Sequence, residues 1–278
     1  MSKIAFDQPG RKVRLDDLSA EPPGGMTREK AEKRFASLSK ELFDLQDAMF
    51  GAKVHSVLVV LQGRDGAGKD GSIKHVVGCL NPRGVSVTSF GVPTIEESQH
   101  DFLWRVHRHA PRLGEFSIFN RSHYEDVLVV RVHELAPRKL WQARFGHIRD
   151  FEELIAEHGT IVLKYFLHIT KKEQEERLLE READPKAAWK LNPNDWKERD
   201  YWDAYTRAYE DAISKTAAKH APWIIVPANA KWYRNLVIAE SIVDALSDHR
   251  KDWEKKLDQM GKAAKAALEA YRSQREKS

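Results

Sequence analysis

The sequence predicts an α/β fold in which a five-stranded parallel sheet carries helices on both faces. Apolar and β-branched segments typical of buried parallel strands recur along the chain, and segments with helical spacing of apolar residues separate them. This alternation favours a parallel sheet, because each crossover helix returns the chain to the same end of the sheet. A glycine-rich turn, Gly63–Lys69, directly follows the first of these strands. No repeat or linker divides the chain, so we expect a single domain over residues 1–278.

The N-terminal half is expected to supply the first three strands. Residues 1–26 are polar with paired prolines and glycines, which is typical of an arm rather than a domain. The pairs Thr94 with Glu97 and Ser122 with Glu125 have capping-box spacing, and each pair predicts the start of a helix. In order, the predicted elements are helix 27–50, strand 54–62, helix 68–80, strand 85–90, helix 94–109, strand 116–119 and helix 122–135.

The C-terminal half is expected to complete the sheet and to add an insertion. A helix ending at Gly159 precedes a mostly apolar fourth strand, 160–169. Residues 171–200 are almost all charged, and we expect them to form a helical lid inserted after that strand. The remaining predicted elements are helix 201–220, strand 222–226 and an amphipathic C-terminal helix from about 232 to 278.

The composition excludes several classes of protein. Hydrophobic residues make up 41% of the chain and charged residues 32%, as in a globular protein. The single cysteine, Cys79, excludes a disulfide framework and a multi-cysteine metal site. No apolar run reaches the ~20 residues of a membrane-spanning helix, and the N-terminus has no secretory signal, so we expect a cytoplasmic protein without a membrane partner. The net charge of +4 does not by itself indicate nucleic-acid binding.

The turn after the first strand has the spacing of a phosphate-binding loop, G-x-x-x-x-G-K. Its glycines allow backbone N–H groups to turn towards a phosphate, and the following helix N-terminus adds positive potential. Lys69 is expected to bridge oxygens of the donor and of the transferred phosphoryl group. A tight turn without a ligand is the alternative, which the flanking strand and helix make less favoured. The candidate phosphate-binding residues here are Gly63, Arg64, Gly66, Ala67, Gly68, Lys69 and, in the following helix, Lys74.

Two aspartates make this loop acidic. Asp70 stands where phosphate loops commonly have a serine or threonine that touches Mg²⁺, and Asp65 lies within the loop. Carboxylates hold Mg²⁺ well, and without a cation they would repel a phosphate. We therefore expect a divalent cofactor, Mg²⁺ or alternatively Mn²⁺, at Asp65 and Asp70. The alternative is that both carboxylates only complement the helix dipole.

A second polar cluster follows the predicted third strand. Asn120 and Arg121 lie at its C-terminal end, and the carboxyl ends of parallel strands meet at the edge where ligands bind. Asn120 is a weaker metal ligand than an aspartate, and Arg121 could neutralise a transferring phosphoryl group. The alternative for Arg121 is a surface salt bridge. Ser122 is better explained as a helix cap than as a hydrolase nucleophile.

Arg177 and Arg181 are four residues apart in the charged insertion and therefore share one face of a helix. A lid with arginines on one face could close over phosphates and exclude water, which would otherwise hydrolyse the donor. Glutamates are interleaved with these arginines, so the spacing fits a solvated helix equally well. If the insertion is a lid over phosphates, Arg177 and Arg181 are the residues that we expect to bind them.

Several segments together resemble the polyphosphate kinase 2 family. Transfer between phosphates relies on positioning, Mg²⁺ and cations rather than on a base, because the acceptor phosphate is already anionic. The resemblance covers roughly residues 27–245, and Asn120 matches the subgroup usually called class III. The matching segments are GRDGAGKDG (63–71), NPRGVSVTSFGVPT (81–94), HDFLWR (100–105), FNRSHYEDVLVVRVH (119–133), KYFLHITKKEQEERLLER (164–181), the WK and W…Y…Y pattern (189–205) and APW (221–223).

The resemblance implies a P-loop kinase fold related to thymidylate kinases. It also implies reversible, Mg²⁺-dependent phosphoryl transfer from inorganic polyphosphate to AMP and ADP, which yields ADP and ATP, and an assembly of two or four copies. The family's catalytic residues then correspond to Asp65, Lys69, Asp70, Asn120, Arg121 and, in the lid, Arg181.

Two other functions stay open on the sequence alone. An ATP-dependent nucleoside monophosphate kinase would share the loop, sheet and lid, whereas a polyphosphate donor has no base to recognise and should lie in a basic groove. A polyanion-binding protein without catalytic activity could use the lysines and arginines of the C-terminal helix. The acidic residues between them favour a solvated helix instead. We expect no nucleic-acid partner.

Overall fold

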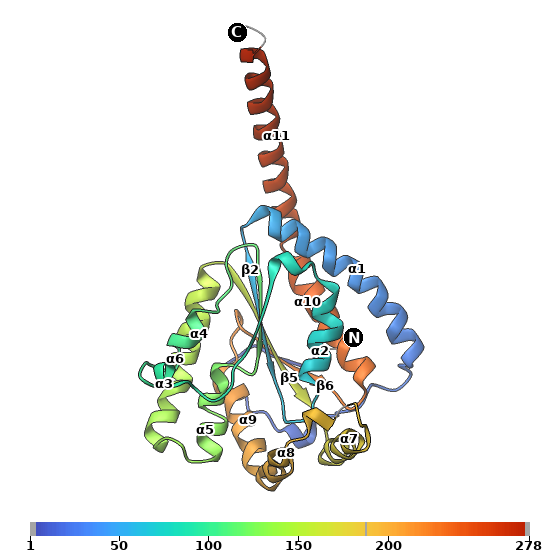
Figure 1. Ribbon diagram of the computed structural model, residues 1–278, viewed down its shortest axis with the longest axis vertical. Coiled ribbons are helices and arrows are strands. Elements are labelled where there is room, and N and C mark those ends of the chain that lie inside the picture. Colours follow the sequence, from blue (N-terminus) through green and yellow to red (C-terminus); the bar gives the residue numbers. More distant parts are fainter. Residues whose placement is uncertain (1–3, 187, 276–278) are drawn as a thin grey trace.

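A single six-stranded sheet forms the centre of the protein (Figure 1). The computed structural model describes residues 4–186 and 188–275, so parts of the predicted arm (1–3), lid (187) and C-terminal helix (276–278) lie outside the described residues. The strand order is β1-β6-β5-β2-β4-β3, and all neighbours are parallel except β1 and β6. The strands are β1 (Ile4–Phe6), β2 (Ser56–Gln62), β3 (Val85–Ser89), β4 (Phe116–Asn120), β5 (Thr160–His168) and β6 (Trp223–Pro227).

Helices cover both faces of the sheet, which confirms the predicted α/β class. Helices α1, α2 and α10 pack on one face, and α4, α5, α6 and α9 lie over the other (Figure 1). Helices α7 and α8 lie beyond the carboxyl ends of β5 and β6. The helices are α1 (Arg28–Ala52), α2 (Lys69–Val76), α3 (Ile95–Ser98), α4 (Trp104–His107), α5 (Val129–Val132), α6 (Arg138–Glu157), α7 (Lys171–Ala183), α8 (Pro193–Lys197), α9 (Trp202–Thr216), α10 (Lys231–Ser247) and α11 (Arg250–Arg275).

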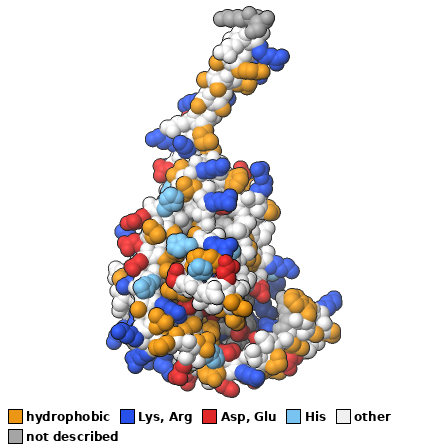
Figure 2. All heavy atoms as spheres, turned by 60° about the vertical axis from the view of Figure 1, so that its left-hand side comes forward, with side chains coloured by type: hydrophobic (Ala, Val, Ile, Leu, Met, Phe, Trp, Pro, Cys, Tyr) orange, Lys and Arg blue, Asp and Glu red, His pale blue; other side chains and the backbone are white. Residues whose placement is uncertain are grey.

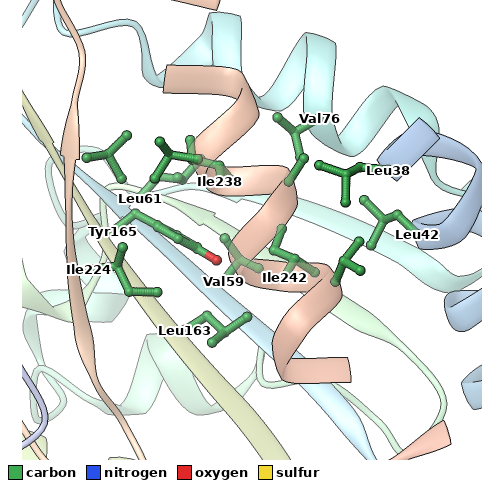
Figure 3. Close-up of a cluster of buried hydrophobic side chains, with 14 of the residues drawn as sticks. Leu38, Leu42, Val59, Leu61, Val76, Leu163, Tyr165, Ile224, Ile238 and Ile242 are labelled. Atoms are coloured by element: carbon green, nitrogen blue, oxygen red, sulfur yellow. The ribbon is translucent and has the colours of Figure 1, made fainter. Parts of the chain in front are cut away.

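Strand β2 is buried along its whole length, as its apolar sequence predicts. Successive side chains of a strand point to opposite faces, so Val59 and Leu61 enter the core under α1 and α10 while Val60 enters the other core. Leu42 of α1 and Ile238 of α10 meet the strand side chains on the first of these faces (Figure 3). Packing on both faces fixes the carboxyl end of β2, where the glycine-rich loop begins.

A buried ionic network lies in the second core. Lys164 of β5 is fully buried, and its Nζ donates to Glu152 Oε2 (2.6 Å), to the Tyr124 hydroxyl (3.0 Å) and to the Thr216 carbonyl (2.8 Å). A buried charge is tolerated when it is paired and fully hydrogen-bonded. Because Tyr124 follows the end of β4 by four residues, the network anchors the turn that carries Asn120 and Arg121.

The sheet has one strand more than the five that the sequence predicts. Residues Ile4–Phe6 of the predicted arm form β1, which pairs antiparallel with β6 so that Phe6 lies opposite Trp223. Phe6 is buried in the second core. A three-residue strand is too short to show a periodicity, and its position depends on a partner near the other end of the chain. The five parallel strands are those that the sequence predicts.

Three predicted helices are interrupted. In the segment predicted as helix 94–109, the Asp101 carboxylate accepts the N–H groups of Leu103 and Trp104 and starts a new turn, so α3 and α4 are separate. The segment 122–135 forms a 3₁₀ turn (His123–Asp126) followed by the short helix α5. The C-terminal segment divides between residues 247 and 250 into α10 and α11.

Helix α11 stands out from the body of the protein (Figure 2). Its first turns pack through the buried Trp253, whereas Met260, Leu268 and Tyr271 are about half exposed further along. The predicted amphipathic character is therefore present, with one face left uncovered in the single chain. Within residues 4–186 and 188–275, no helix combines the length and apolar character that crossing a membrane requires.

Candidate active site

The predicted phosphate-binding loop joins the end of β2 to the start of α2. Gly66 and Gly68 have φ angles of 80° and 97°, a region that residues with a side chain rarely adopt. A Cβ atom at Gly68 would also lie 1.9 Å from the end of the Arg234 side chain, which would then have to move. The local sequence thus explains the turn, and a distant arginine explains why one of its glycines is needed.

Lys69 begins α2 and folds back over its own loop. Its Nζ donates to the carbonyls of Gly63 (2.6 Å) and Arg64 (3.3 Å). An ammonium has three N–H donors, so one donor remains for a ligand in this arrangement. Burial lowers the pKa of Lys69 from its ordinary value, while the carboxylate of Asp65 acts to raise it. A bound phosphate would add negative charge beside the ammonium and favour its charged form.

The two loop carboxylates each face a residue from the end of β4. Arg121 Nη2 donates to Asp65 Oδ1 (2.9 Å), and Asn120 Nδ2 donates to Asp70 Oδ1 (2.9 Å). Asn120 is directly opposite Leu61 in the sheet, two residues before Gly63, which is why these segments meet. The structure therefore brings together four of the residues that the sequence predicts.

Arg121 has a left-handed backbone conformation, with φ of 61°. Such a conformation is uncommon for a residue with a side chain and costs roughly 1 kcal/mol. Its N–H donates to the Leu61 carbonyl (3.2 Å), which continues the sheet by one bond before the chain turns. Ser122 is a cap, as predicted, but its hydroxyl accepts the N–H of Tyr124 at a 3₁₀ turn, while the N–H of Glu125, its expected capping-box partner, donates to the Ser122 carbonyl. This corner directs the Arg121 guanidinium back towards Asp65.

The oxygen atoms at this corner suit a divalent cation. Asn120 Oδ1 is buried and has no hydrogen-bond partner among the described residues, since the amide nitrogen is the group that faces Asp70. Carboxylate and amide oxygens are the hard ligands that Mg²⁺ takes in proteins, usually with waters and substrate phosphates completing the shell. In the described part of the chain no three His, Cys, Asp or Glu side chains cluster as a metal site. The chain therefore offers a partial site of the kind that phosphate oxygens complete.

Arg177 of α7 borders the cleft, but its guanidinium is engaged in supporting the loop. Nη1 donates to the carbonyls of Gly66 (2.9 Å) and Ala67 (3.1 Å), and Nη2 to those of Ala228 and Asn229 (2.6 and 2.8 Å). Nε donates to Glu173 (2.7 Å). A guanidinium has five N–H donors, and all five are engaged here. Arg177 therefore ties α7, the loop and the end of β6 together and has no donor left for a phosphate in this arrangement.

Arg181 lies one helical turn beyond Arg177 and lines the cleft. Its Nη1 donates to Asp195 Oδ2 of α8 (2.7 Å). Burial and the nearby Asp65 carboxylate raise the pKa of Asp195, while Arg181 opposes that shift. Charged groups of the predicted lid thus lie close to the loop carboxylates.

Two predicted phosphate-binding side chains lie elsewhere. The Arg64 guanidinium stacks over the Trp202 ring at 3.7 Å and donates to the Trp202 carbonyl (3.0 Å) and the Thr206 hydroxyl. Only the backbone of Arg64 therefore belongs to the phosphate loop. Lys74 is on the exposed side of α2 and is not among the residues that line the cleft.

A cleft of about 920 Å³ begins at the loop and runs between α2, α7 and the first turns of α1 and α10. Its charges are mixed, which differs from the uniformly basic groove that a polyphosphate donor suggests. The charged residues that line it are Arg28, Glu32, Asp65, Lys69, Asp70, Arg121, Arg177, Glu180, Arg181, Asp184, Asp195, Lys231 and Arg234. Two of the carboxylates are the candidate metal ligands, so a bound cation would shift the balance towards positive charge.

Sequence reasoning missed three residues at this site. Glu125, assigned only to a helix cap, lines a second, smaller pocket beside Asp65, Arg121 and the aromatic rings of α9, and burial raises its pKa. Gln174 Nε2 donates to the Asp65 carbonyl (2.8 Å). Arg234 lies behind the loop. No local pattern marks Gln174 or Arg234, because each reaches the loop from a helix distant in sequence.

The fold and the loop define the class of protein. A parallel sheet whose central strand leads into a glycine-rich loop, with a lysine at the start of the next helix, is the framework of P-loop kinases. In this class, nucleotide or polyphosphate phosphates bind at the loop, and catalysis rests on positioning and charge.

Comparison with known proteins identifies the family within that class. The family model "Polyphosphate kinase 2 (PPK2)" matches residues 25–254. The chain is 49% identical to the AMP/ADP-polyphosphate phosphotransferase of Meiothermus ruber, over 83% of this chain and 85% of that protein. It is 41% identical to the ADP-polyphosphate phosphotransferase of Rhodopseudomonas palustris, over 74% and 76% of the two chains.

Solved structures agree with that match. The crystal structure of polyphosphate kinase 2 from Arthrobacter aurescens TC1 superposes with a TM-score of 0.83 at 38% identity, over 89% of this chain and 92% of that one. The chain belongs to the polyphosphate kinase 2 family, and it is an enzyme of the phosphotransferase type.

Proposed function

We propose that the protein transfers phosphoryl groups reversibly from inorganic polyphosphate to AMP and to ADP, with Mg²⁺ as cofactor. The family supports the donor, and the Meiothermus ruber relative, whose name includes both AMP and ADP, supports the two acceptors. Asn120 at the end of β4 matches the subgroup that the sequence resembles.

The observation that carries this proposal is the meeting of the loop with the end of β4. Lys69 and the carboxylates of Asp65 and Asp70 lie at the head of a cleft of about 920 Å³, with Asn120 and Arg121 beside them. Cations that surround a transferring phosphoryl group stabilise the charge on its oxygens. Lys69 and Arg121 are the residues that we assign to that role, together with Arg181 from the lid.

The reaction needs no general base from the protein. An oxygen of the acceptor phosphate forms a bond to the terminal phosphorus of the polyphosphate, and the bond from that phosphorus to the next bridging oxygen breaks. The shortened chain leaves with the electron pair of that bond. Lys69 and Arg121 hold the reacting phosphates together, and closure of the lid around Arg181 excludes water, the competing acceptor.

Asp65, Asp70 and Asn120 are the residues that would hold the Mg²⁺. When bound, the cation would neutralise charge on the phosphate groups of the substrates. In its absence, Arg121 and Asn120 donate to the same carboxylates. We expect no product when a chelator removes divalent cations, and recovery on adding Mg²⁺ or, to a smaller extent, Mn²⁺.

Incubation of the purified protein with Mg²⁺, long-chain polyphosphate and AMP, followed over time by chromatography of the nucleotides, tests the proposal. We expect ADP first and ATP afterwards. If ADP were the only product, ADP would not be an acceptor of this enzyme. No product from polyphosphate, together with ADP formed when ATP replaces it, would identify an ATP-dependent monophosphate kinase instead.

An assembly of two or four copies is part of the proposal. Helix α11 leaves Met260, Leu268 and Tyr271 partly exposed beyond the body of the chain, and exposed apolar side chains on one element favour association. Light scattering of the full-length protein tests this point. We expect a mass of two or four times 32.0 kDa, and a mass of 32.0 kDa would contradict it.

A further inference from the structure

Arg234 is a buried cation directly beneath the phosphate loop. It lies in the first turns of α10 and is only 2% exposed. Its Nη1 points at the carbonyl of Ala67 (3.5 Å), and its Nε and Nη2 donate to the Asn235 side chain (3.1 and 2.9 Å). None of these acceptors carries a charge.

The loop above Arg234 has glycine at two positions that lie against the guanidinium. A Cβ atom at Gly68 would lie 1.9 Å from Nη1, and one at Gly71 would lie 3.0 Å from Nη2. Both glycines belong to the motif that binds phosphate or to the first turn of α2. The guanidinium thus reaches the underside of the loop because the chain has no side chain at either position.

The charge of Arg234 has no counter-charge in the described part of the chain. No carboxylate lies within ion-pair distance of it there, and no aromatic ring stacks on it. Burial, and then the positive charge of Arg177, lower the pKa of Arg234 to about 10. Arg177 itself is paired with Glu173 at 2.7 Å.

Several other buried cations in the described part of the chain have a carboxylate or an aromatic ring as a partner. Lys164 is paired with Glu152 at 2.6 Å, and Arg64 stacks on Trp202 at 3.7 Å. A buried charge without a partner is costly, so its retention beside a ligand site suggests that the ligand supplies the missing charge. Polyphosphate carries a negative charge on each unit and binds, under the proposed function, in the cleft that this loop and Arg234 both line.

We propose that Arg234 is a positioning residue for the phosphoryl chain, whose uncompensated charge acts through the loop and is neutralised when polyphosphate binds. This inference rests on the proposed function. Arg234 acts from its place against Ala67 and Gly68 of the loop. It places a positive charge under Gly68, where the N-terminus of α2 already favours an anion.

The test separates the charge of Arg234 from its shape. Arg234→Lys keeps the charge and loses the guanidinium contacts, Arg234→Gln loses the charge but keeps a hydrogen-bonding side chain, and Arg234→Met loses both. Arg34→Met controls for net charge. It removes an exposed cation of α1 that is paired with Glu240, a residue of the helix α10 that also carries Arg234. Tripolyphosphate affinity in the presence of Mg²⁺ is measured by calorimetry, and Tm is measured without ligand.

We expect the affinity for tripolyphosphate to depend on the charge at position 234, and the Tm to depend on the contacts of the guanidinium. Arg234→Gln and Arg234→Met should bind tripolyphosphate about tenfold more weakly than the parent, as expected for the loss of one partly screened unit charge beside an anion. Arg234→Lys should bind within about threefold of the parent although its Tm falls as in the other variants. The KM for polyphosphate should rise in parallel, with the KM for AMP unchanged.

Three results would overturn the inference. If Arg234→Lys bound as weakly as Arg234→Met, the shape of the side chain and not its charge would matter. If both neutral variants bound like the parent, the charge would be irrelevant to the ligand. If the unmodified protein did not bind tripolyphosphate at all, the proposed donor would be wrong as well, so the two failures are distinguishable.

Discussion

The loop side and the lid side of the cleft hold their charged side chains in different ways. On the loop side, the partly buried Lys69 and the buried Arg177 donate mainly to backbone carbonyls. On the lid side, Arg181 is joined to Asp195 and Arg199 to Glu175 by side-chain ion pairs that are partly exposed. The first set of contacts is fixed by the fold, whereas the second consists of pairs that a competing anion can replace.

This difference indicates which parts are preformed. Exposed ion pairs contribute only about 0–1 kcal/mol each, so exchanging Asp195 for a phosphate group as the partner of Arg181 is inexpensive. Removing a buried guanidinium that holds five acceptors leaves those acceptors without partners and costs far more. Phosphate binding should therefore reorganise the lid and leave the loop in place. The following substitutions test this contrast, starting from the largest effect.

Lys69→Ala should lower kcat/KM about 10³-fold, because it removes the ammonium that we assign to the reacting phosphates. Asp70→Ala should have a comparable effect through the metal. Steady-state kinetics with polyphosphate and AMP checks both, and circular dichroism should show the parent fold. Lys139→Ala, on the exposed start of α6, is the control. Turnover at the parent rate in either loop variant would contradict the mechanism.

Arg181→Met should lower kcat about 10²-fold without changing Tm by more than about 2 °C, since only a partly exposed ion pair is lost from the fold. The competing hydrolysis of polyphosphate should rise relative to transfer, because the closed lid excludes water. Kinetics and thermal unfolding on the same sample check the prediction. A large fall in Tm would show that Arg181 supports the fold as Arg177 does.

Arg177→Lys should lower activity about tenfold and also reduce the free energy of unfolding by about 1–3 kcal/mol. A lysine has three donors and cannot reach all five acceptors that the guanidinium contacts. Urea unfolding followed by fluorescence gives the stability change. Loss of activity at parent stability would mean that Arg177 contacts the substrate and that the loop does not depend on it.

Asn120→Asp should shift the Mg²⁺ concentration for half-maximal rate by a few-fold and alter the preference between AMP and ADP. The substitution replaces the donor to Asp70 with a second carboxylate. Two facing carboxylates repel each other, so they favour a bound cation more strongly than a carboxylate that faces an amide. Magnesium titrations with each acceptor measure the effect. Unchanged kinetics would show that position 120 is not near the metal.

The sequence could predict the loop and its supporting strand because their signals are local. Apolar residues of β2, the glycines and Lys69 lie within fifteen residues, and the Thr94–Glu97 capping box is present as predicted. The difference between Arg177 and Arg181 could not be predicted in this way. Both share one helix face and border the cleft, but the loop lies beside the first, so loop carbonyls occupy the Arg177 guanidinium while Arg181 pairs with Asp195.

Residues that reach the site from distant elements show the same limit. Arg234 and Gln174 contact the loop only because α10 and α7 pack against it, and spacing in the sequence carries no information on that packing. The break between α3 and α4 has a local cause, because the Asp101 carboxylate accepts the N–H of Leu103 and starts a new turn. The helical spacing of apolar residues across this segment nevertheless led to the prediction of one continuous helix. Strand β1 could not be predicted from its own residues, because it forms by pairing with β6, roughly two hundred residues later in the chain.

Strand β1 also has a consequence for how the molecule is made. The partners of Ile4–Phe6 in β6 emerge from the ribosome roughly two hundred residues later than Ile4–Phe6 themselves, so this contact forms late. Until then the outer edge of β6 has no cover, and an open strand edge invites pairing with another chain. Shortening or tagging the N-terminus should therefore show its effect as aggregated nascent protein at high expression temperature, even where the purified enzyme is as active as the parent.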